Sequence, residues 1–190
     1  MKRISLSLLV FLFLGFAATA QTEKGNWLVG GTLGLNTSKN NTNINFSPAA
    51  GYFFLHNFAA GAALNLGYSK IAFNKVTTFG IGPFARYYFG TMNIRPFGDA
   101  ELSFDSQKSK TTSSSSSTTV ASTVNSTSVF FGAGLAGFIN RNVAIEGLAG
   151  YSHTSTNIAG SANTGGFNLR VGFQVYLSNS QVQDLKGGKL

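Results

Sequence analysis

The sequence contains no cysteine, which excludes disulfide bonds, thiolate metal sites and a lipidated N-terminal cysteine. Only two histidines are present, so we expect no metal and no other cofactor. Charged residues make up 11% of the 190 residues, whereas soluble domains carry roughly 25%. The hydrophobic fraction of 43% argues against a disordered chain. Much of the folded surface is therefore expected to avoid water.

The N-terminus has the pattern of a secretory signal peptide. Lys2 and Arg3 form its basic region, residues 5–16 form its apolar region, and residues 18–20 are small, as a cleavage site requires. The apolar run is shorter than the ~20 residues that a membrane-spanning helix needs. We therefore predict that residues 1–20 are removed on export.

The rest of the chain is dominated by alternation with a period of two, which is the signal of β-strands. In the first such segment Trp27 and Leu33 fall on a bulky apolar face, whereas Thr32 and Asn36 fall on a small or polar face. Eight segments share this pattern: 26–36, 43–55, 58–69, 77–89, 94–105, 126–139, 143–153 and 166–177.

The lengths of these segments and of their connections favour a membrane barrel. Strands of soluble proteins usually have five or six residues, whereas tilted membrane-spanning strands need about ten. The connections alternate in length: 37–42, 56–57, 70–76, 90–93, 106–125, 140–142 and 154–165. Short turns at one end and longer loops at the other are typical of outer-membrane barrels, with the longer loops extracellular.

The placement of charge indicates which face is outward. A secreted soluble barrel would also alternate, but with its apolar face inward and a charged outer face. Here the apolar face carries no charge, and the other face is too sparsely charged for a solvated shell. We therefore predict an all-β fold: an eight-stranded antiparallel up-and-down transmembrane β-barrel. Its parts are a lead (21–24), the barrel (25–177) and a short tail (178–190), with both termini periplasmic.

The charged residues of the inward face are expected to form an ion-pair network in the lumen, because buried charges need partners. They are Arg86, Arg95, Asp99, Glu101, Glu146 and Arg170. The turn at 90–93 would bring Arg86 beside Asp99, and the last hairpin would bring Arg170 near Glu146. A barrel of eight strands has little room inside, so a plugged lumen is favoured over a small channel, which remains the alternative.

Two features are predicted for the loops. Residues 106–128 are low in complexity and rich in Ser and Thr, and we interpret them as a mobile external loop. Five lysines fall in the outer loops or at their edges: Lys39, Lys70, Lys75, Lys108 and Lys110. They either contact lipopolysaccharide phosphates or only keep the loops soluble. Nucleic acid is not an expected partner, because the basic residues do not cluster on a helix and the chain is exported.

One motif has the residue types of a possible catalytic site. Ser152-His153-Thr154-Ser155 resembles the His-x-Ser spacing of the lipid A deacylase family, and alternation places His153 towards lipid. A His-Ser pair also needs a carboxylate that orients the imidazole, and residues 154–183 contain none. We therefore expect no enzyme, and a histidine at the lipid headgroups instead.

Over residues 25–177 the pattern resembles the small OmpA/OmpX-like outer-membrane barrel superfamily. The last segment resembles the assembly signal of such barrels, with Arg170, Gly172, Val175 and Leu177 at the matching positions. The resemblance implies recognition by the barrel assembly machinery, although here a tail follows the signal. We expect a monomeric barrel with a structural or surface-interaction role.

Overall fold

The computed structural model describes residues 22–38, 41–71, 74–112, 119–157 and 163–186. The predicted signal peptide therefore lies outside the described residues, and so does Lys39. No helix in the described part of the chain has the length and hydropathy needed to cross a membrane.

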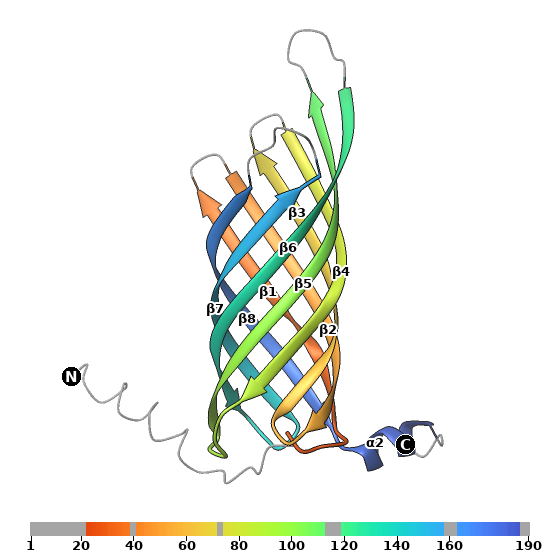
Figure 1. Cartoon of the computed structure of the whole chain (residues 1–190), viewed down its shortest axis with the longest axis vertical. Helices are drawn as coiled ribbons and strands as arrows, with labels where there is room; N and C mark the ends of the chain where they lie inside the picture. The colour runs from red at the N-terminus through yellow and green to blue at the C-terminus, as the bar shows by residue number, and fades with distance from the viewer. Residues whose placement is uncertain (1–21, 39–40, 72–73, 113–118, 158–162, 187–190) are drawn as a thin grey trace, which may run out of the picture.

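Eight strands form one closed barrel, in which each strand is antiparallel to the next and β8 returns to β1 (Figure 1). This arrangement confirms the predicted fold class. The strands are β1 (Trp27–Ser38), β2 (Asn41–Leu55), β3 (Phe58–Ile71), β4 (Asn74–Tyr88), β5 (Ile94–Thr112), β6 (Thr119–Phe138), β7 (Val143–Thr156) and β8 (Thr164–Leu177).

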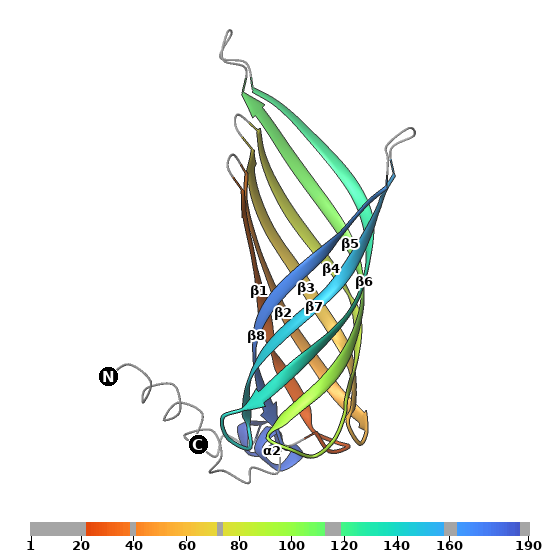
Figure 2. The same cartoon turned by 90° about the vertical axis from the view of Figure 1, so that its left-hand side faces the viewer.

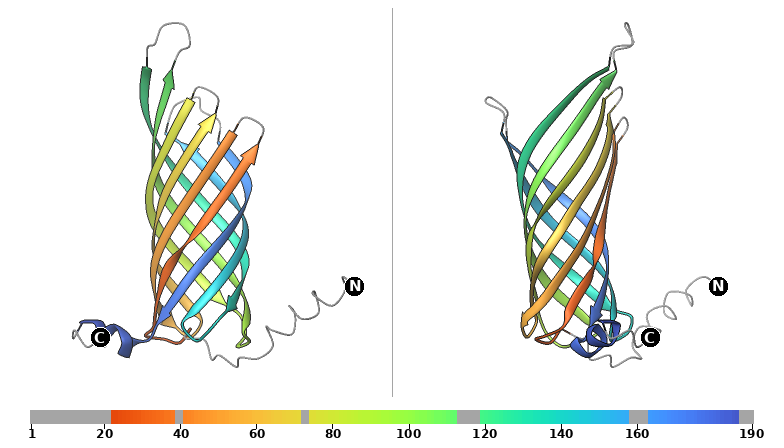
Figure 3. Two further views of the ribbon diagram at one scale, coloured as in Figure 1. Left: turned by 180° about the vertical axis from the view of Figure 1, so that it is seen from behind. Right: turned by 90° about the vertical axis from the view of Figure 1, so that its right-hand side faces the viewer.

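Alternation along each strand separates an apolar outer face from the lumen. The side chains of Leu33, Phe79 and Phe131 point outward and are 53%, 55% and 65% exposed. Arg86 and Asp99, which have the opposite parity, are 4% and 5% exposed inside the barrel. The strands are tilted around the barrel, as Figure 3 shows from two sides. Tilting is required to close a sheet of this size.

The prediction of an external loop over residues 106–128 is wrong for most of that segment. Strand β5 continues to Thr112, and β6 begins at Thr119; the two are paired without interruption from Ile94↔Gly137 to Thr112↔Thr119. Thr and Val are β-branched and favour strands, and hairpin pairing satisfies the backbone even where no core is buried. The β5–β6 hairpin rises above the other strands in Figure 2.

The three short turns lie at one end of the barrel, which we call the short-turn end, and the longer connections lie at the other, the long-loop end. Asn57 closes the β2–β3 turn with a φ of 63°, a conformation that Asn tolerates better than most residues. Helix α2 (Asn179–Lys186) follows β8 at the short-turn end (Figure 1). Ser178 Oγ accepts a hydrogen bond of 3.3 Å from the Gln181 amide and so caps this helix.

Candidate functional site

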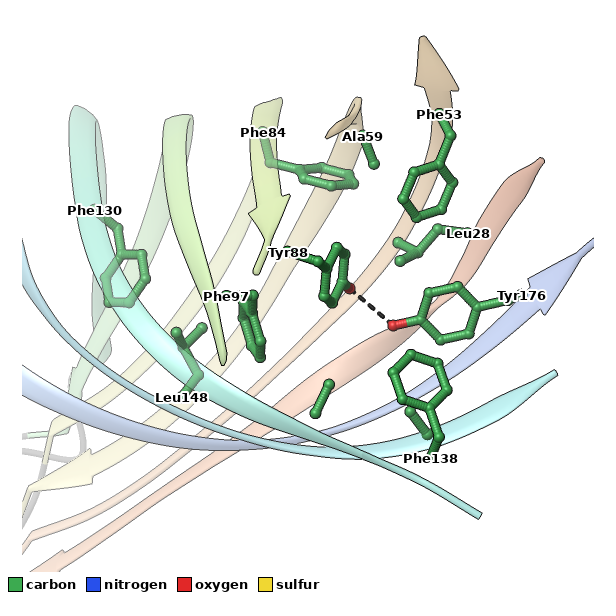
Figure 4. Close-up of a cluster of buried hydrophobic side chains, with 12 residues drawn as sticks. Leu28, Phe53, Ala59, Phe84, Tyr88, Phe97, Phe130, Phe138, Leu148 and Tyr176 are labelled. Atoms are coloured by element: carbon green, nitrogen blue, oxygen red, sulfur yellow. Dashed lines mark hydrogen bonds between the residues drawn. The ribbon is translucent and has the colours of Figure 1, made fainter. Parts of the chain in front are cut away.

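Much of the barrel interior is occupied by buried apolar side chains, most of them near the short-turn end (Figure 4). They are Leu28, Phe53, Ala59, Phe84, Tyr88, Phe97, Phe130, Ala136, Phe138, Ala144, Leu148 and Tyr176. The alternation in the sequence predicted small and polar side chains in the lumen, and these aromatic ones were not predicted. Their parity along the strands was the signal that could have identified them, because they alternate with the outward apolar residues.

A network of five buried polar side chains lies among these aromatic rings. Arg86 donates from Nε to Asp99 Oδ2 at 2.5 Å and from Nη1 to Glu146 Oε2 at 2.7 Å. The hydroxyls of Tyr88 and Tyr176 donate to Glu146 Oε1 at 3.1 and 3.0 Å. The same two hydroxyls lie 2.8 Å apart, which is the contact drawn in Figure 4. The network thus joins strands β4, β5, β7 and β8 across the lumen.

This network contains one guanidinium between two carboxylates, and all three side chains are at most 4% exposed. Charges removed from water are tolerated only when partners satisfy them. Arg86 provides both ion pairs, and its Cζ also lies 4.5 Å from the centre of the Phe97 ring. The expected pairing of Arg86 with Asp99 is present, because the register places these residues directly opposite each other.

A third ion pair lies further towards the long-loop end. Arg170 Nη1 donates to Glu101 Oε2 at 2.7 Å, and the two side chains are 18% and 15% exposed. The expected pairing of Arg170 with Glu146 is therefore wrong. In the β7–β8 register Arg170 lies opposite Leu148, and the Glu146 carboxylate is already engaged by Arg86. Arg170 instead reaches across the lumen to a strand that is distant in sequence.

The Arg170 guanidinium stacks on Phe130, with its Cζ 4.0 Å from the ring centre. Two glycines leave space for that ring. A β-carbon at Gly132 would lie 2.6 Å from Phe130 Cζ, and one at Gly150 would overlap the same ring. Such distances are too short for any real side chain, so both positions must remain glycine for Phe130 to keep its place.

Arg95 is at the short-turn end and belongs to none of the three ion pairs in the described residues, contrary to prediction. Its Nη1 donates to Thr22 Oγ1 at 2.6 Å, and its Nε donates to the Met92 carbonyl at 3.1 Å. Thr22 Oγ1 donates in turn to Asn57 Oδ1 at 2.6 Å. Thr22 is fully buried, so the N-terminal lead folds across this end of the barrel. Sequence patterns gave no indication of this contact.

The long-loop half of the lumen holds a cavity of about 460 Å³, which we call the vestibule. Its walls carry mainly Asn, Ser and Thr side chains, and Glu101, Arg170 and Phe130 are among its lining residues. On one wall Asn65 Nδ2 donates to Ser103 Oγ at 2.7 Å, and Ser103 Oγ donates to Asp105 Oδ1 at 2.7 Å. Asp105 is 8% exposed and belongs to no ion pair in the described part of the chain.

Four of the five predicted lysines form a cluster on the outer face at the long-loop end. Lys70 lies directly opposite Lys75, and Lys75 lies directly opposite Lys110, on adjacent strands β3, β4 and β5. Lys108 is two residues before Lys110 and points the same way. All four are exposed. We call Lys70, Lys75, Lys108 and Lys110 the lysine cluster.

The structure also places the other predicted residues. His153 is exposed on the outer face of β7, opposite Val129 and Gly165. The predicted assembly signal falls within β8, with Arg170 and Gly172 on the lumen side. Val175 and Leu177 share the strand face of the exposed Phe173.

Comparisons with known proteins agree with this architecture. A family model described as an outer membrane protein beta-barrel domain matches residues 6–183. No curated protein matches the sequence.

Three solved structures illustrate the likeness in fold. The N-terminal barrel domain of Pseudomonas aeruginosa OprF is 17% identical, with 81% of this chain and 98% of that chain covered and a TM-score of 0.53. Neisserial surface protein A is 18% identical, with 80% of this chain and 97% of that chain covered and a TM-score of 0.50. P. aeruginosa OprG is 11% identical, with 84% of this chain and 99% of that chain covered and a TM-score of 0.51. With the family match over nearly its whole length, this chain belongs to the outer membrane protein β-barrel family.

Proposed function

We propose that this outer-membrane barrel is a non-conducting, monomeric surface protein whose outer face binds the phosphate groups of lipopolysaccharide. The observation that carries the proposal is the lysine cluster. Residues directly opposite each other on antiparallel strands have β-carbons about 5 Å apart, and like charges in such pairs are destabilising. Two successive pairs of this kind, Lys70–Lys75 and Lys75–Lys110, form one row.

The protein itself supplies no counter-charge to this row. The chain has six acidic residues, all of them in the part that the structure describes. Asp99, Glu101, Asp105 and Glu146 have lumen parity, whereas the remaining two belong to the N-terminal lead and α2 at the short-turn end. An external anion is therefore the partner that would relieve the repulsion among the lysines.

The position of the cluster suits the phosphates of a lipid headgroup. Lys70 follows Tyr68 on the same face by one alternation, and Tyr68 is an exposed aromatic residue at the end of the apolar outer surface. Basic side chains at that height meet the phosphate layer of the outer leaflet. This requires the long loops to face the cell exterior and both termini to lie in the periplasm, which we propose from the division into short turns and long loops.

The binding test compares a cluster variant with a matched control. The variant is Lys70→Gln/Lys75→Gln/Lys110→Gln, and the control is Lys24→Gln/Arg141→Gln, which removes exposed basic residues at the short-turn end. Basic side chains near an anionic surface contribute about 1 kcal/mol each, so the cluster variant should bind lipopolysaccharide about a hundredfold more weakly. Affinity of the wild type should also fall with salt. Equal losses in variant and control would refute the proposal.

A closed lumen is the second part of the proposal. The Arg86 network and the surrounding aromatic rings occupy the interior between the vestibule and the short-turn end. Thr22 and Arg95 add a further layer at that end. We expect no conductance steps when the barrel is inserted into planar bilayers at pH 7. Reproducible single-channel steps would favour the alternative, a small channel.

We infer no catalytic role. His153 would need a nearby carboxylate to orient its imidazole, and the acidic residues of the chain lie in the lumen or at the short-turn end. Lipid A from cells that express the wild type should have the same mass spectrum as lipid A from cells that express His153→Ala. Loss of an acyl chain with the wild type alone would contradict this inference.

We also propose that the barrel assembly machinery recognises β8. Val175 and Leu177 lie on the outward face of this closing strand, where a partner strand or protein can reach them before the barrel closes. Replacement of both by Ser should lower the amount of barrel in the outer membrane, whereas replacement of the outward Ile145 should not. Unchanged insertion of the β8 variant would argue against recognition at these positions.

A further inference from the structure

The seam between β1 and β8 is paired along only part of its length. It runs from Trp27↔Leu177 to Leu33↔Val171. Strand β1 continues to Ser38 against β2, and β8 begins at Thr164 against β7. Within the described residues, no pair joins β1 and β8 beyond Leu33 and Val171. In Figure 2 the long-loop end of β8 leans away from β1.

The exposure of β8 side chains changes along the strand in agreement with this opening. On its outward face, Phe173 is 52% exposed and Val171 is 62% exposed. Leu169 and Phe167, which lie beyond the last pair with β1, are 79% and 87% exposed. These two side chains have lost the neighbouring strand that shields residues lower on the same face. They form an apolar lip beside the open part of the seam.

The vestibule reaches this lip. Its lining includes the lumen-facing Asn168 and Arg170 and also the outward Phe167 and Leu169. On the other side of the seam the lining includes Gly34 of β1, which lies just beyond the last pair with β8. The vestibule is therefore bordered by both strands of the seam where their pairing ends.

The vestibule and its lip differ in chemistry. Beyond Leu33 and Val171 the edges of β1 and β8 no longer pair with each other, so their backbone polar groups need other partners, which hydrocarbon alone cannot supply. The lining of the vestibule carries the carboxylates of Glu101 and Asp105 and the guanidinium of Arg170, so this lining has an excess of one negative charge. Since Arg170 is paired with Glu101, the carboxylate without a basic partner among the described ion pairs is Asp105. A cation with hydrogen-bond donors suits this site.

We propose that the open seam is a lateral entrance through which a single-chain amphiphile with a primary ammonium headgroup binds. The headgroup lies in the vestibule and donates to Asp105, and the alkyl chain lies along Phe167 and Leu169 in the surrounding lipid. The site is separate from the lysine cluster, which binds anions on the strands β3 to β5. Neither proposal depends on the other.

The opening is tested with engineered cysteines, because the natural chain has none. Continuation of the seam register would place position 35 opposite position 169. The control pair Leu33→Cys/Val171→Cys lies within the paired part and should form a disulfide on mild oxidation. The pair Leu35→Cys/Leu169→Cys should remain reduced and should be joined only by a longer bis-maleimide. Equal disulfide formation in both pairs would mean that the seam is closed and would overturn the proposal.

Binding is tested with octylammonium on the barrel in phosphatidylcholine nanodiscs, by NMR shifts of backbone amides. We expect saturable shifts at residues such as Ser103, Asn168 and Leu169. Asp105→Asn, which keeps the shape of the side chain, should weaken binding at least about tenfold through loss of a charge-assisted hydrogen bond. Phe167 is so exposed that its replacement by Ala should not affect folding. Phe167→Ala should weaken binding of octylammonium, because the alkyl chain of the ligand loses an apolar contact.

Two control ligands each keep one part of octylammonium, either the alkyl chain or the ammonium headgroup. Octyl sulfate has the same chain with the opposite charge, and ethanolamine has the headgroup without the chain. Both should bind far more weakly than octylammonium. Equal binding of octyl sulfate, or affinity unchanged in Asp105→Asn, would overturn the ammonium site. Crosslinking between two copies through Leu169→Cys would assign the edge to a second barrel instead.

Discussion

The two halves of the lumen are built from the same alternating strands but are filled differently. In the short-turn half, the rings of Phe53, Tyr88 and Tyr176 surround Arg86 and its two carboxylates. The side chains of these three aromatic residues and of Arg86 are at most 4% exposed. In the long-loop half, Asn, Ser and Thr side chains line a cavity of about 460 Å³. The size of the inward side chains, rather than the strand pattern, thus divides one barrel into a packed part and a hollow part.

The three ion pairs of the lumen follow the same division. Arg86 and its carboxylates are almost fully buried, whereas Arg170 and Glu101 border the vestibule and retain some exposure. Burial increases the penalty for an unpaired charge, because water cannot replace the lost partner. The short-turn half should therefore govern the stability of the barrel, and the long-loop half is free to bind ligands.

The largest expected effect is that of Arg86→Ala. The substitution leaves Asp99 and Glu146 buried without a cation, which should lower the free energy of unfolding by about 3–5 kcal/mol. Arg170→Ala is the matched comparison in the vestibule, with an expected loss of about 1–3 kcal/mol. Urea-induced unfolding in lipid vesicles measures both values. Equal losses would remove the distinction between the two halves.

A smaller effect is expected where the packed part meets the vestibule. Gly150→Ala would place a β-carbon against both the Phe130 ring and the Phe131 carbonyl oxygen, so the ring and the neighbouring backbone must move, at an expected loss of about 1–3 kcal/mol. Gly147 lies on the same strand, and a β-carbon there meets no atom within 4 Å. Gly147→Ala is therefore the control and should leave the unfolding midpoint unchanged. A similar loss in both variants would place the effect in the strand backbone instead.

Removal of the vestibule ion pair is expected to leave the lumen closed. Glu101→Ala/Arg170→Ala widens the hollow half but leaves the Arg86 network in place, so we expect no conductance in planar bilayers. The double variant should still show the heat-dependent shift in electrophoretic mobility of a folded barrel. Conductance in this variant would show that the upper pair, and not the lower network, closes the lumen.

The smallest effect is expected at the tip of the β5–β6 hairpin. Replacement of residues 112–119 by Asn-Gly would join Thr111 to Val120, which are opposite each other in the register, through a two-residue turn. Strand β4 pairs with β5 only as far as Thr111, so this replacement removes no β4–β5 pair, and the free energy of unfolding should change by less than about 0.5 kcal/mol. A large loss would mean that this hairpin stabilises the barrel.

Some features of this protein follow from the sequence alone. A strand places successive side chains on opposite faces, so the period of two in the eight segments fixed which residues face outward and which face the lumen. The register of a tight hairpin follows from the turn, which is why the Arg86–Asp99 contact could be expected. The small number of charges, and their absence from the apolar face of the eight segments, identified a surface that avoids water.

Other features required the closed barrel. Arg170 pairs with Glu101 and not with Glu146, because the lumen brings together strands that are distant in sequence. The N-terminal lead reaches Arg95 through Thr22, a contact that no local pattern encodes. The strand pairing over residues 106–112 and 119–128 depends on a partner strand, whereas composition alone suggested a loop. Alternation determined the faces of each strand, but contacts across the lumen and the partial seam between β1 and β8 depend on how eight strands close into one barrel.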